Sequence, residues 1–342
     1  MAKKRVVSQD VANLAGVSRT TVSLVLNNVE GANISPATRQ RVLDAADQLG
    51  YVPNATAQAL VTQRAQAIGL IMTRSPDHIA SDNFLPQILG GLLNVIKKEN
   101  FRLLIEIVED GEHDRAYIEL AQAKHIDGMI ILTPRATDVG LKKLGEMNIP
   151  AVLFGYLPEC TLPSVHVDDR KAAETATQYL IGLGHREIAC ILNAPHIYNT
   201  GRDRALGYRD ALKKANIPFR ESLVRYADFD PSSGYEAMQS LLDAGEKFSA
   251  VFVASDNVAM GAKSALQKAN LAVPEDISML GFDNIPWAAY ASPPLTTIKV
   301  PAQKMASEAC SLLLDLIKGE KPEQQDVVLD AELIVRQSCQ PV

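Results

Sequence analysis

The spacing of apolar residues divides the chain into a short head and a long body. Up to residue 50, apolar side chains recur every three or four positions, a period that predicts amphipathic helices. From Ala67 onward, short apolar runs alternate with amphipathic stretches such as 172–183 and 258–270, as strands and helices alternate in α/β domains. We therefore expect a helical head and an α/β body with parallel sheets. The expected strands are 68–72, 103–107, 129–132, 151–154, 188–192, 250–253 and 277–280.

Helix-ending and helix-starting residues sharpen the prediction for the head. Gly16 and Gly50 stand where left-handed backbone ends a helix, and Ser18 and Ser35 stand where a hydroxyl caps the free amides of the next one. Pro36 fits the first position of a helix. Three helices follow, and the first two form the pattern of a helix-turn-helix over 8–28. The side chains expected to face inward are Val11, Leu14, Ala15, Val22, Val25, Leu26, Val42, Ala46 and Leu49.

A helix-turn-helix places the start of its second helix at the base edges of the major groove. Arg19 lies there and can form a bidentate pair with guanine, although a solvated surface charge is the alternative interpretation. Leu24 could touch a thymine methyl group or make no contact at all. The candidate contacts to DNA in this helix are Ser18, Arg19, Thr20, Thr21, Ser23, Leu24 and Asn27.

The distribution of charge agrees with a DNA-binding head. Residues 1–64 hold seven Lys and Arg against four Asp and Glu, a net +3, so the remainder must carry −9 to give the −6 of the whole chain. A basic head on an acidic body suggests an anion-binding module joined to something else. The N-terminus lacks the apolar core of a signal peptide, and no apolar run approaches the roughly 18 residues of a membrane helix. We expect a cytoplasmic protein with no membrane partner.

Motifs of enzymes are missing from the chain. There is no G-x-S-x-G, H-E-x-x-H, phosphate-binding loop or G-x-G-x-x-G, and neither the six histidines nor the four cysteines have metal-ligand spacing. We therefore expect no catalytic activity, no metal and no cofactor. A rival hypothesis is a secreted solute-binding protein, but such a protein needs a signal peptide and has no use for residues 1–60.

Two sequence motifs resemble the lac/gal repressor (LacI) family. They are D-V-A-x-x-A-G-V-S-x-x-T-V-S-x-x-L-N, beginning at Asp10, and G-Y-x-P-N-x-x-A-x-x-L, beginning at Gly50. In that family the second motif is a hinge helix that folds on operator DNA, where a leucine wedges into the minor groove. Leu60 is at the wedge position, whereas Gln58 stands where many relatives have Arg. The hinge residues that the resemblance assigns to DNA are Asn54, Ala57, Gln58 and Leu60.

The resemblance also implies a fold for the body. It predicts a two-lobed, type I periplasmic-binding-protein-like α/β effector domain behind the all-α helix-turn-helix domain, with three passages of the chain between the lobes. The implied divisions are a headpiece over 1–50, a hinge helix and linker over 51–64, a first lobe over 65–163 and 296–322, and a second lobe over 164–295 and 323–342.

Two fragments of the body resemble segments that line the family's effector pocket. R-x-x-G-[YF] within 199–208 puts Arg204 at a ligand-binding arginine, and G-F-D-N at 281–284 puts Asp283 at a ligand-binding aspartate. A carboxylate accepts from adjacent hydroxyls and a guanidinium donates in a fixed fork, so the pair suits a sugar. Further candidates for effector contact are Phe229, Asp169, Ser255, Phe84, Tyr198 and Trp287.

Several of these residues have structural alternatives. Phe84 could belong to the core, and Asp169 could pair with Arg170 or Lys171. We expect Asp256 to cap the helix that follows it rather than to touch a ligand. Tyr198 stands where purine-binding relatives have a basic residue, which favours a neutral ligand.

These observations predict a transcriptional regulator whose affinity for a pseudo-palindromic operator is controlled by a mono- or oligosaccharide. A purine or another co-repressor is the alternative effector, and the sign of the response is left open. The chain ends without the leucine-repeat tail that tetrameric relatives carry, so we expect a homodimer.

Overall fold

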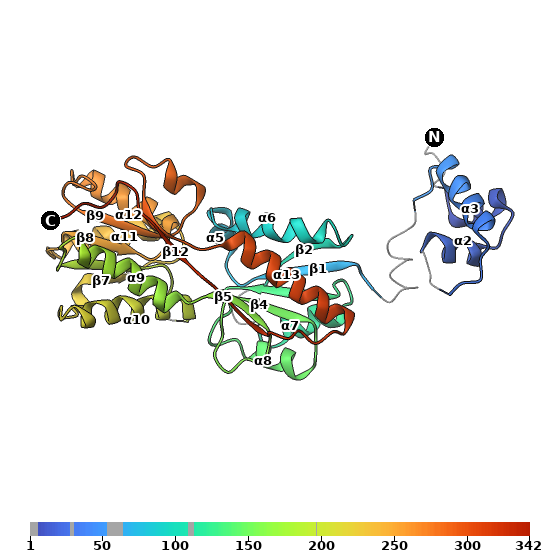
Figure 1. Ribbon diagram of the computed structural model, residues 1–342, viewed down its shortest axis with the longest axis horizontal. Helices are drawn as coiled ribbons and strands as arrows, with labels where there is room; N and C mark the ends of the chain where they lie inside the picture. The colour runs from blue at the N-terminus through green and yellow to red at the C-terminus, as the bar shows by residue number, and fades with distance from the viewer. Residues whose placement is uncertain (1–5, 28–30, 53–63, 109–112, 196) are drawn as a thin grey trace. The chain divides into compact units, whose positions relative to one another are not determined.

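The computed structural model describes residues 6–27, 31–52, 64–108, 113–195 and 197–342. The chain divides into two compact units, 1–66 and 67–342, and each is described by itself (Figure 1). Among the described residues, no helix is both long enough and apolar enough to span a membrane.

The first unit holds the predicted helices α1 (Ser8–Ala15), α2 (Arg19–Leu26) and α3 (Pro36–Gln48) around one small core. Gly16 ends α1 in the left-handed conformation, with φ of 66°. Ser18 and Ser35 cap α2 and α3 by accepting hydrogen bonds from the backbone amides of Thr21 (3.1 Å) and Thr38 (3.2 Å). All three caps agree with the prediction.

One predicted core residue of the first unit was wrong. Leu14 is 48% exposed, and Ala12 is buried instead, beside Val11 and Ala15. Residues 11, 12 and 15 lie on one helix face because each residue turns the helix by about 100°, and residue 14 falls to the side of that face.

The second unit contains two six-stranded sheets, each in a lobe of its own. The first sheet has the strand order β11-β5-β4-β3-β1-β2, and every neighbouring pair in it is parallel. Its strands are β1 (Ala67–Met72), β2 (Arg102–Ile107), β3 (Gly128–Leu132), β4 (Ala151–Phe154), β5 (Ser164–Val167) and β11 (Asp326–Leu329). Its helices are α5 (Pro76–Ala80), α6 (Leu85–Ile96), α7 (His113–Gln122), α8 (Val139–Glu146) and α13 (Ala302–Lys318).

The second sheet has the order β12-β10-β9-β8-β6-β7, with β12 antiparallel to β10 at one edge. Its strands are β6 (Ile188–Leu192), β7 (Val224–Tyr226), β8 (Ala250–Val253), β9 (Ser278–Asp283), β10 (Thr296–Lys299) and β12 (Glu332–Ile334). Its helices are α9 (Asp169–Gly182), α10 (Asn199–Lys214), η1 (Glu221–Leu223), α11 (Pro231–Asp243), α12 (Asp256–Lys268) and η2 (Pro286–Ala289).

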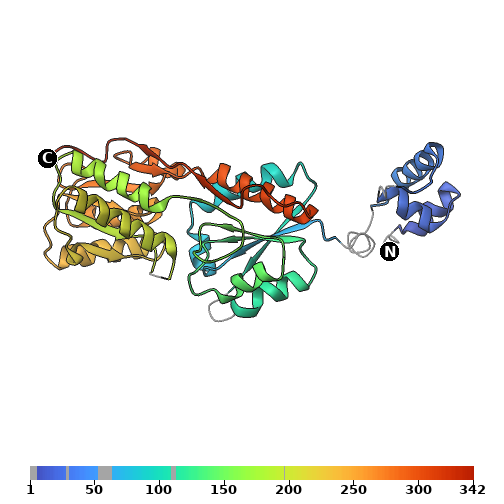
Figure 2. The ribbon, with the colours of Figure 1, turned by 60° about the horizontal axis from the view of Figure 1, so that its bottom comes forward.

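Helices cover both faces of the second sheet. In β6, Cys190 packs into the core shared with α9 and α10, whereas Ile191 packs into the core shared with α11 and α12. Successive side chains of a strand point to opposite faces, so each helix pair covers one face. Figures 1 and 2 show α9 beside α10 and α11 beside α12.

The chain passes between the two sheets three times: after β5, after β10 and between β11 and β12. Three strands therefore lie in the sheet opposite to the one implied by the predicted lobe boundaries. β5 and β11 belong to the first sheet, where Ser164 pairs with Asp326, and β10 belongs to the second, where Thr296 pairs with Leu280. The passages come later than predicted because each of these strands completes its ladder before the chain leaves the lobe.

Candidate functional site

A cavity lies between the two lobes, at the carboxyl ends of the strands, where open α/β sheets bind ligands. The space in the cavity and the open solvent at its mouth together amount to about 750 Å³. Its lining combines charged and polar groups with aromatic rings, a composition typical of sites for small polar ligands. The lining residues are Arg74, Asp82, Phe84, Thr133, Phe154, Gly155, His166, Val167, Asp169, Asn193, Thr200, Arg204, Phe229, Ser255, Asn257, Asp283, Val300 and Met305.

Arg204, in α10, is the best-held charge in the cavity. Its Nε donates to Asp169 Oδ1 at 2.7 Å, and its Nη1 donates to the backbone oxygen of Ala254 at 2.6 Å. The guanidinium carbon lies 3.8 Å from the centre of the Phe282 ring. These contacts fix the guanidinium plane, so Arg204 presents a fixed set of donors to the cavity. Asp169 thus pairs with Arg204, and not with Arg170 or Lys171 as the alternative prediction had it.

Asp283, at the end of β9, lies 3.9 Å from Arg204 Nη1. Its φ of 109° is in a region that favours glycine, and such strained residues cluster at functional sites. Burial raises the pKa of the carboxyl to about 7, although Arg204 and the Ser255 hydroxyl both lower it. Asp283 is therefore an acceptor whose ionisation falls close to neutral pH.

The prediction that Asp256 caps α12 was wrong by one residue. Ser255 is the cap, and its hydroxyl accepts from the backbone amide of Asn257 at 3.2 Å. Asp256 is fully buried behind the cavity, where it accepts from Thr297 Oγ1 (2.7 Å) and from the backbone amide of Ile285 (3.0 Å). Burial and the neighbouring Asp283 raise the pKa of Asp256. Asp256 has a structural role, while Ser255 lines the cavity, and its contact with an effector stays a prediction.

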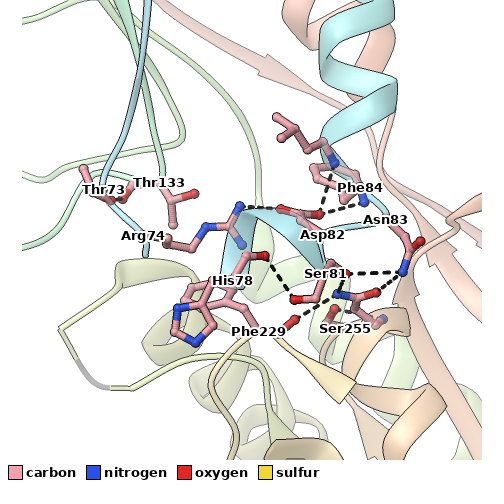
Figure 3. Close-up of polar contacts among 12 residues, drawn as sticks. Thr73, Arg74, His78, Ser81, Asp82, Asn83, Phe84, Thr133, Phe229 and Ser255 are labelled. Atoms are coloured by element: carbon pink, nitrogen blue, oxygen red, sulfur yellow. Dashed lines mark hydrogen bonds and ion pairs between the residues drawn. The ribbon is translucent and has the colours of Figure 1, made fainter. Parts of the chain in front are cut away.

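The lobes contact each other beside the cavity through the segment between β1 and α6 (Figure 3). Arg74 pairs with Asp82 within this segment, and its guanidinium lies 4.8 Å from the ring centre of Phe229 in the second lobe. Asn257 donates to the backbone oxygens of Ser81 (2.8 Å) and Phe229 (3.1 Å), which joins the two lobes through one side chain. The first lobe is thereby held against the ring that lines the cavity.

Phe84 and Phe229 both line the cavity, and Phe84 also packs against the core of the first lobe. Two other predicted residues do not line it. Tyr198 lies behind Phe229, with ring centres 5.0 Å apart, and its hydroxyl accepts from Arg135 Nε at 3.0 Å. Trp287 packs against the core formed with α11 and α12. Trp287 lies in η2 and packs toward that core, so it does not line the cavity.

Four cavity residues were not predicted from the sequence: Arg74, Asp82, Asn193 and Asn257. Asn193 directly follows β6, and Arg74 follows β1 by two residues. The rule that ligands bind at the carboxyl ends of strands would have marked both of these residues. Asp82 and Asn257 carry no comparable signal, because their positions depend on how the lobes meet.

In the first unit, the start of α2 is well ordered by its cap. The hydroxyls of Ser18 and Thr21 lie 2.9 Å apart, and Asn27 Nδ2 donates to Ser23 Oγ at 3.1 Å. Arg19 and Thr20 are exposed on the first turn, and Leu24 is half-buried. Asn54, Ala57, Gln58 and Leu60 lie outside the described residues.

Comparisons with known proteins agree with this arrangement. Residues 9–54 match the model for bacterial regulatory proteins of the lacI family, and residues 177–339 match a periplasmic binding protein-like domain. The transcriptional regulator CelR of Thermobifida fusca is 36% identical over 98% of this chain and 99% of its own length. The transcriptional repressor CytR of Escherichia coli K12 is 35% identical over 96% of this chain and 95% of its own.

Solved structures give the same result. A CelR–cellobiose complex, 35% identical, superposes with a TM-score of 0.75 over 98% of this chain and all of that one. The lac repressor dimer bound to operator and the anti-inducer ONPF, 27% identical, gives a TM-score of 0.86 over the same shares.

A helix-turn-helix unit joined to a two-lobed ligand-binding domain defines a DNA-binding transcriptional regulator. The chain belongs to the lacI family of bacterial regulatory proteins.

Proposed function

We propose that this protein is a homodimeric repressor whose affinity for operator DNA is controlled by an uncharged sugar bound between its lobes. The observation that carries the proposal is the arrangement of Arg204, Asp169 and Asp283 in a cavity that also exposes the ring of Phe229. Similarity over the full length to CelR, whose solved complex contains cellobiose, supports a sugar.

The chemistry of the cavity suits neighbouring hydroxyl groups. The carboxylate of Asp283 accepts from two adjacent hydroxyls, and Arg204 donates to a ring or hydroxyl oxygen. The rings of Phe229 and Phe84 can pack on the apolar face of a pyranose. Three carboxyls against two guanidiniums line the cavity, a balance that disfavours a phosphorylated ligand. We expect the sugar to leave the cavity unchanged.

For DNA, we assign base contacts to Arg19 and Thr20 and backbone contacts to the neighbouring polar side chains of α2. Ser18 caps the helix by accepting from the backbone amide of Thr21, and the remaining amides of a helix N-terminus suit a phosphate. Leu60 is proposed to wedge into the minor groove, as its position in the family motif implies. Because the proposed role requires contact with DNA, we expect the protein in the cytoplasm.

An exposed edge strand supports a dimer. β2 is the last strand of the first sheet, and its Leu104, Ile105 and Ile107 are exposed, as is Leu93 on the nearby α6. Exposed apolar edge strands are normally covered by another element or chain. In a two-fold symmetric dimer, the two copies of β2 would cover each other. Two headpieces would then read the two halves of a near-palindrome.

Coupling between the two sites follows from thermodynamics. A sugar that binds preferentially to the closed lobes changes the affinity of the protein for operator DNA. Operator DNA must then change the affinity for the sugar by the same factor. The contacts of Asn257 and Arg74 across the lobes favour the closed arrangement in which the cavity is formed.

The test is fluorescence anisotropy of the full-length protein on a palindromic operator from its own promoter, at fixed salt. Cellobiose, ribose, cytidine and hypoxanthine are titrated into the complex, with random DNA as the control. Release or tightening by a sugar supports the proposal. A response to hypoxanthine alone would replace the sugar by a purine co-repressor, and equal affinity for operator and random DNA would refute specific recognition.

A further inference from the structure

The side chain of Asn193 is buried in the cavity wall, and within the described part of the chain its oxygen accepts no hydrogen bond. Asn193 follows β6, and its backbone oxygen accepts from the amide of Phe229 at 2.8 Å, which fixes the position of the residue. The residue is 4% exposed, and its Oδ1 has no partner among the residues that the structure describes. Thr200 Oγ1, on another residue of the same lining, is in the same state.

Other buried asparagines of the same lobe behave differently. Asn199 Nδ2 donates to the backbone oxygen of Tyr156 at 3.1 Å, and Asn257 donates across the lobes. The great majority of buried polar side-chain atoms in native proteins have a partner, because an unpaired one destabilises the fold. An apolar side chain of similar size would fit the position of Asn193 at lower free energy. The retained amide therefore indicates a partner that binds in the cavity.

We propose that Asn193 is a specificity-determining residue whose side-chain oxygen accepts a hydrogen bond from a hydroxyl of the bound effector. The inference rests on the proposed function for the location of the effector and extends it to a residue outside the Arg204–Asp283 pair. A site built to pair a hydroxyl rejects analogues without it, because the amide is then left buried and unpaired.

The test compares three variants of the full-length protein by thermal unfolding and by calorimetric titration with cellobiose, ribose, cytidine and hypoxanthine. Asn193→Leu removes the unpaired oxygen and keeps the number and branching of side-chain heavy atoms, and Asn193→Asp keeps an acceptor oxygen. Asn199→Leu is the matched control, since Asn199 is equally buried but hydrogen-bonded.

For Asn193→Leu we expect the melting temperature of the ligand-free protein to rise by about 2 °C. We expect its affinity for the ligand that binds the wild type to fall about tenfold or more. Asn193→Asp should retain most of the affinity. Asn199→Leu should lower the melting temperature, because it removes a hydrogen bond that exists.

If Asn193→Leu lowers the melting temperature as much as Asn199→Leu does, the amide of Asn193 is structural and the inference is overturned. Wild-type affinity in Asn193→Leu would overturn it as well. If none of the four compounds binds the wild type, the sugar assignment fails, and the ligand-free melting temperature still decides: a rise supports the inference and a fall refutes it. Failure of Asn193→Leu to fold while Asn193→Asp folds and binds normally also counts against it.

Discussion

Effector affinity should depend on pH through Asp283. Burial raises the pKa of this carboxyl to about 7, and a ligand hydroxyl donates better to the ionised form. About nine-tenths of the Asp283 side chains are then ionised at pH 8 and about one-tenth at pH 6. If the ligand binds only the ionised form, the apparent Kd should be about tenfold weaker at pH 6 than at pH 8.

The stability of the ligand-free protein should change in the opposite direction. Between about pH 4 and pH 7, folded Asp283 holds a proton that the unfolded chain has lost, so the free energy of unfolding falls as pH rises through this window. The contribution is about 4 kcal/mol at most and is constant above pH 7. Asp283→Asn cannot ionise and should therefore be more stable than the wild type at pH 8.

The assay is calorimetric titration with cellobiose at pH 6, 7 and 8, beside urea unfolding of the ligand-free protein. Asp283→Asn should bind more weakly at pH 8 and lose the pH dependence. His166 also lines the cavity, so His166→Gln serves as the control and should keep the slope. A wild-type affinity that is flat from pH 6 to pH 8, or a slope that survives in Asp283→Asn, would refute the reasoning.

Three further outcomes are expected. Arg204→Ala should abolish the effector response while operator binding persists, as measured by fluorescence anisotropy. The control is Arg170→Ala, at an exposed ion pair of the same lobe, which should leave both the response and operator binding intact. Ser18→Ala and Ser35→Ala should each lower headpiece stability by about 1 kcal/mol, measured by thermal unfolding, but Ser18→Ala alone should strongly weaken operator binding. Equal losses of operator affinity would argue against α2 as the reading helix. Asp256→Ala removes the acceptor of two buried hydrogen bonds and should lower the free energy of unfolding, measured in urea, by about 2–4 kcal/mol.

Local signals in the sequence determined much of this protein. Gly16, Ser18 and Ser35 mark helix ends because their chemistry acts on backbone groups within three or four residues of them. The alternation of strands and helices in the body is a short-range pattern as well. Arg204 and Asp283 were predicted as effector contacts from short motifs, and both line the cavity.

Tertiary structure alone decided which strands share a sheet and which side chains meet. The local sequence does not show to which sheet β5, β10 and β11 belong. Their sheet is decided by pairing with strands distant in sequence, as between Asp326 and Ser164. Asn257 lines the cavity because it lies where the two lobes contact each other. Tyr198 does not line the cavity, because it packs against the ring of Phe229, which does. Such positions depend on long-range packing, which no local sequence pattern encodes.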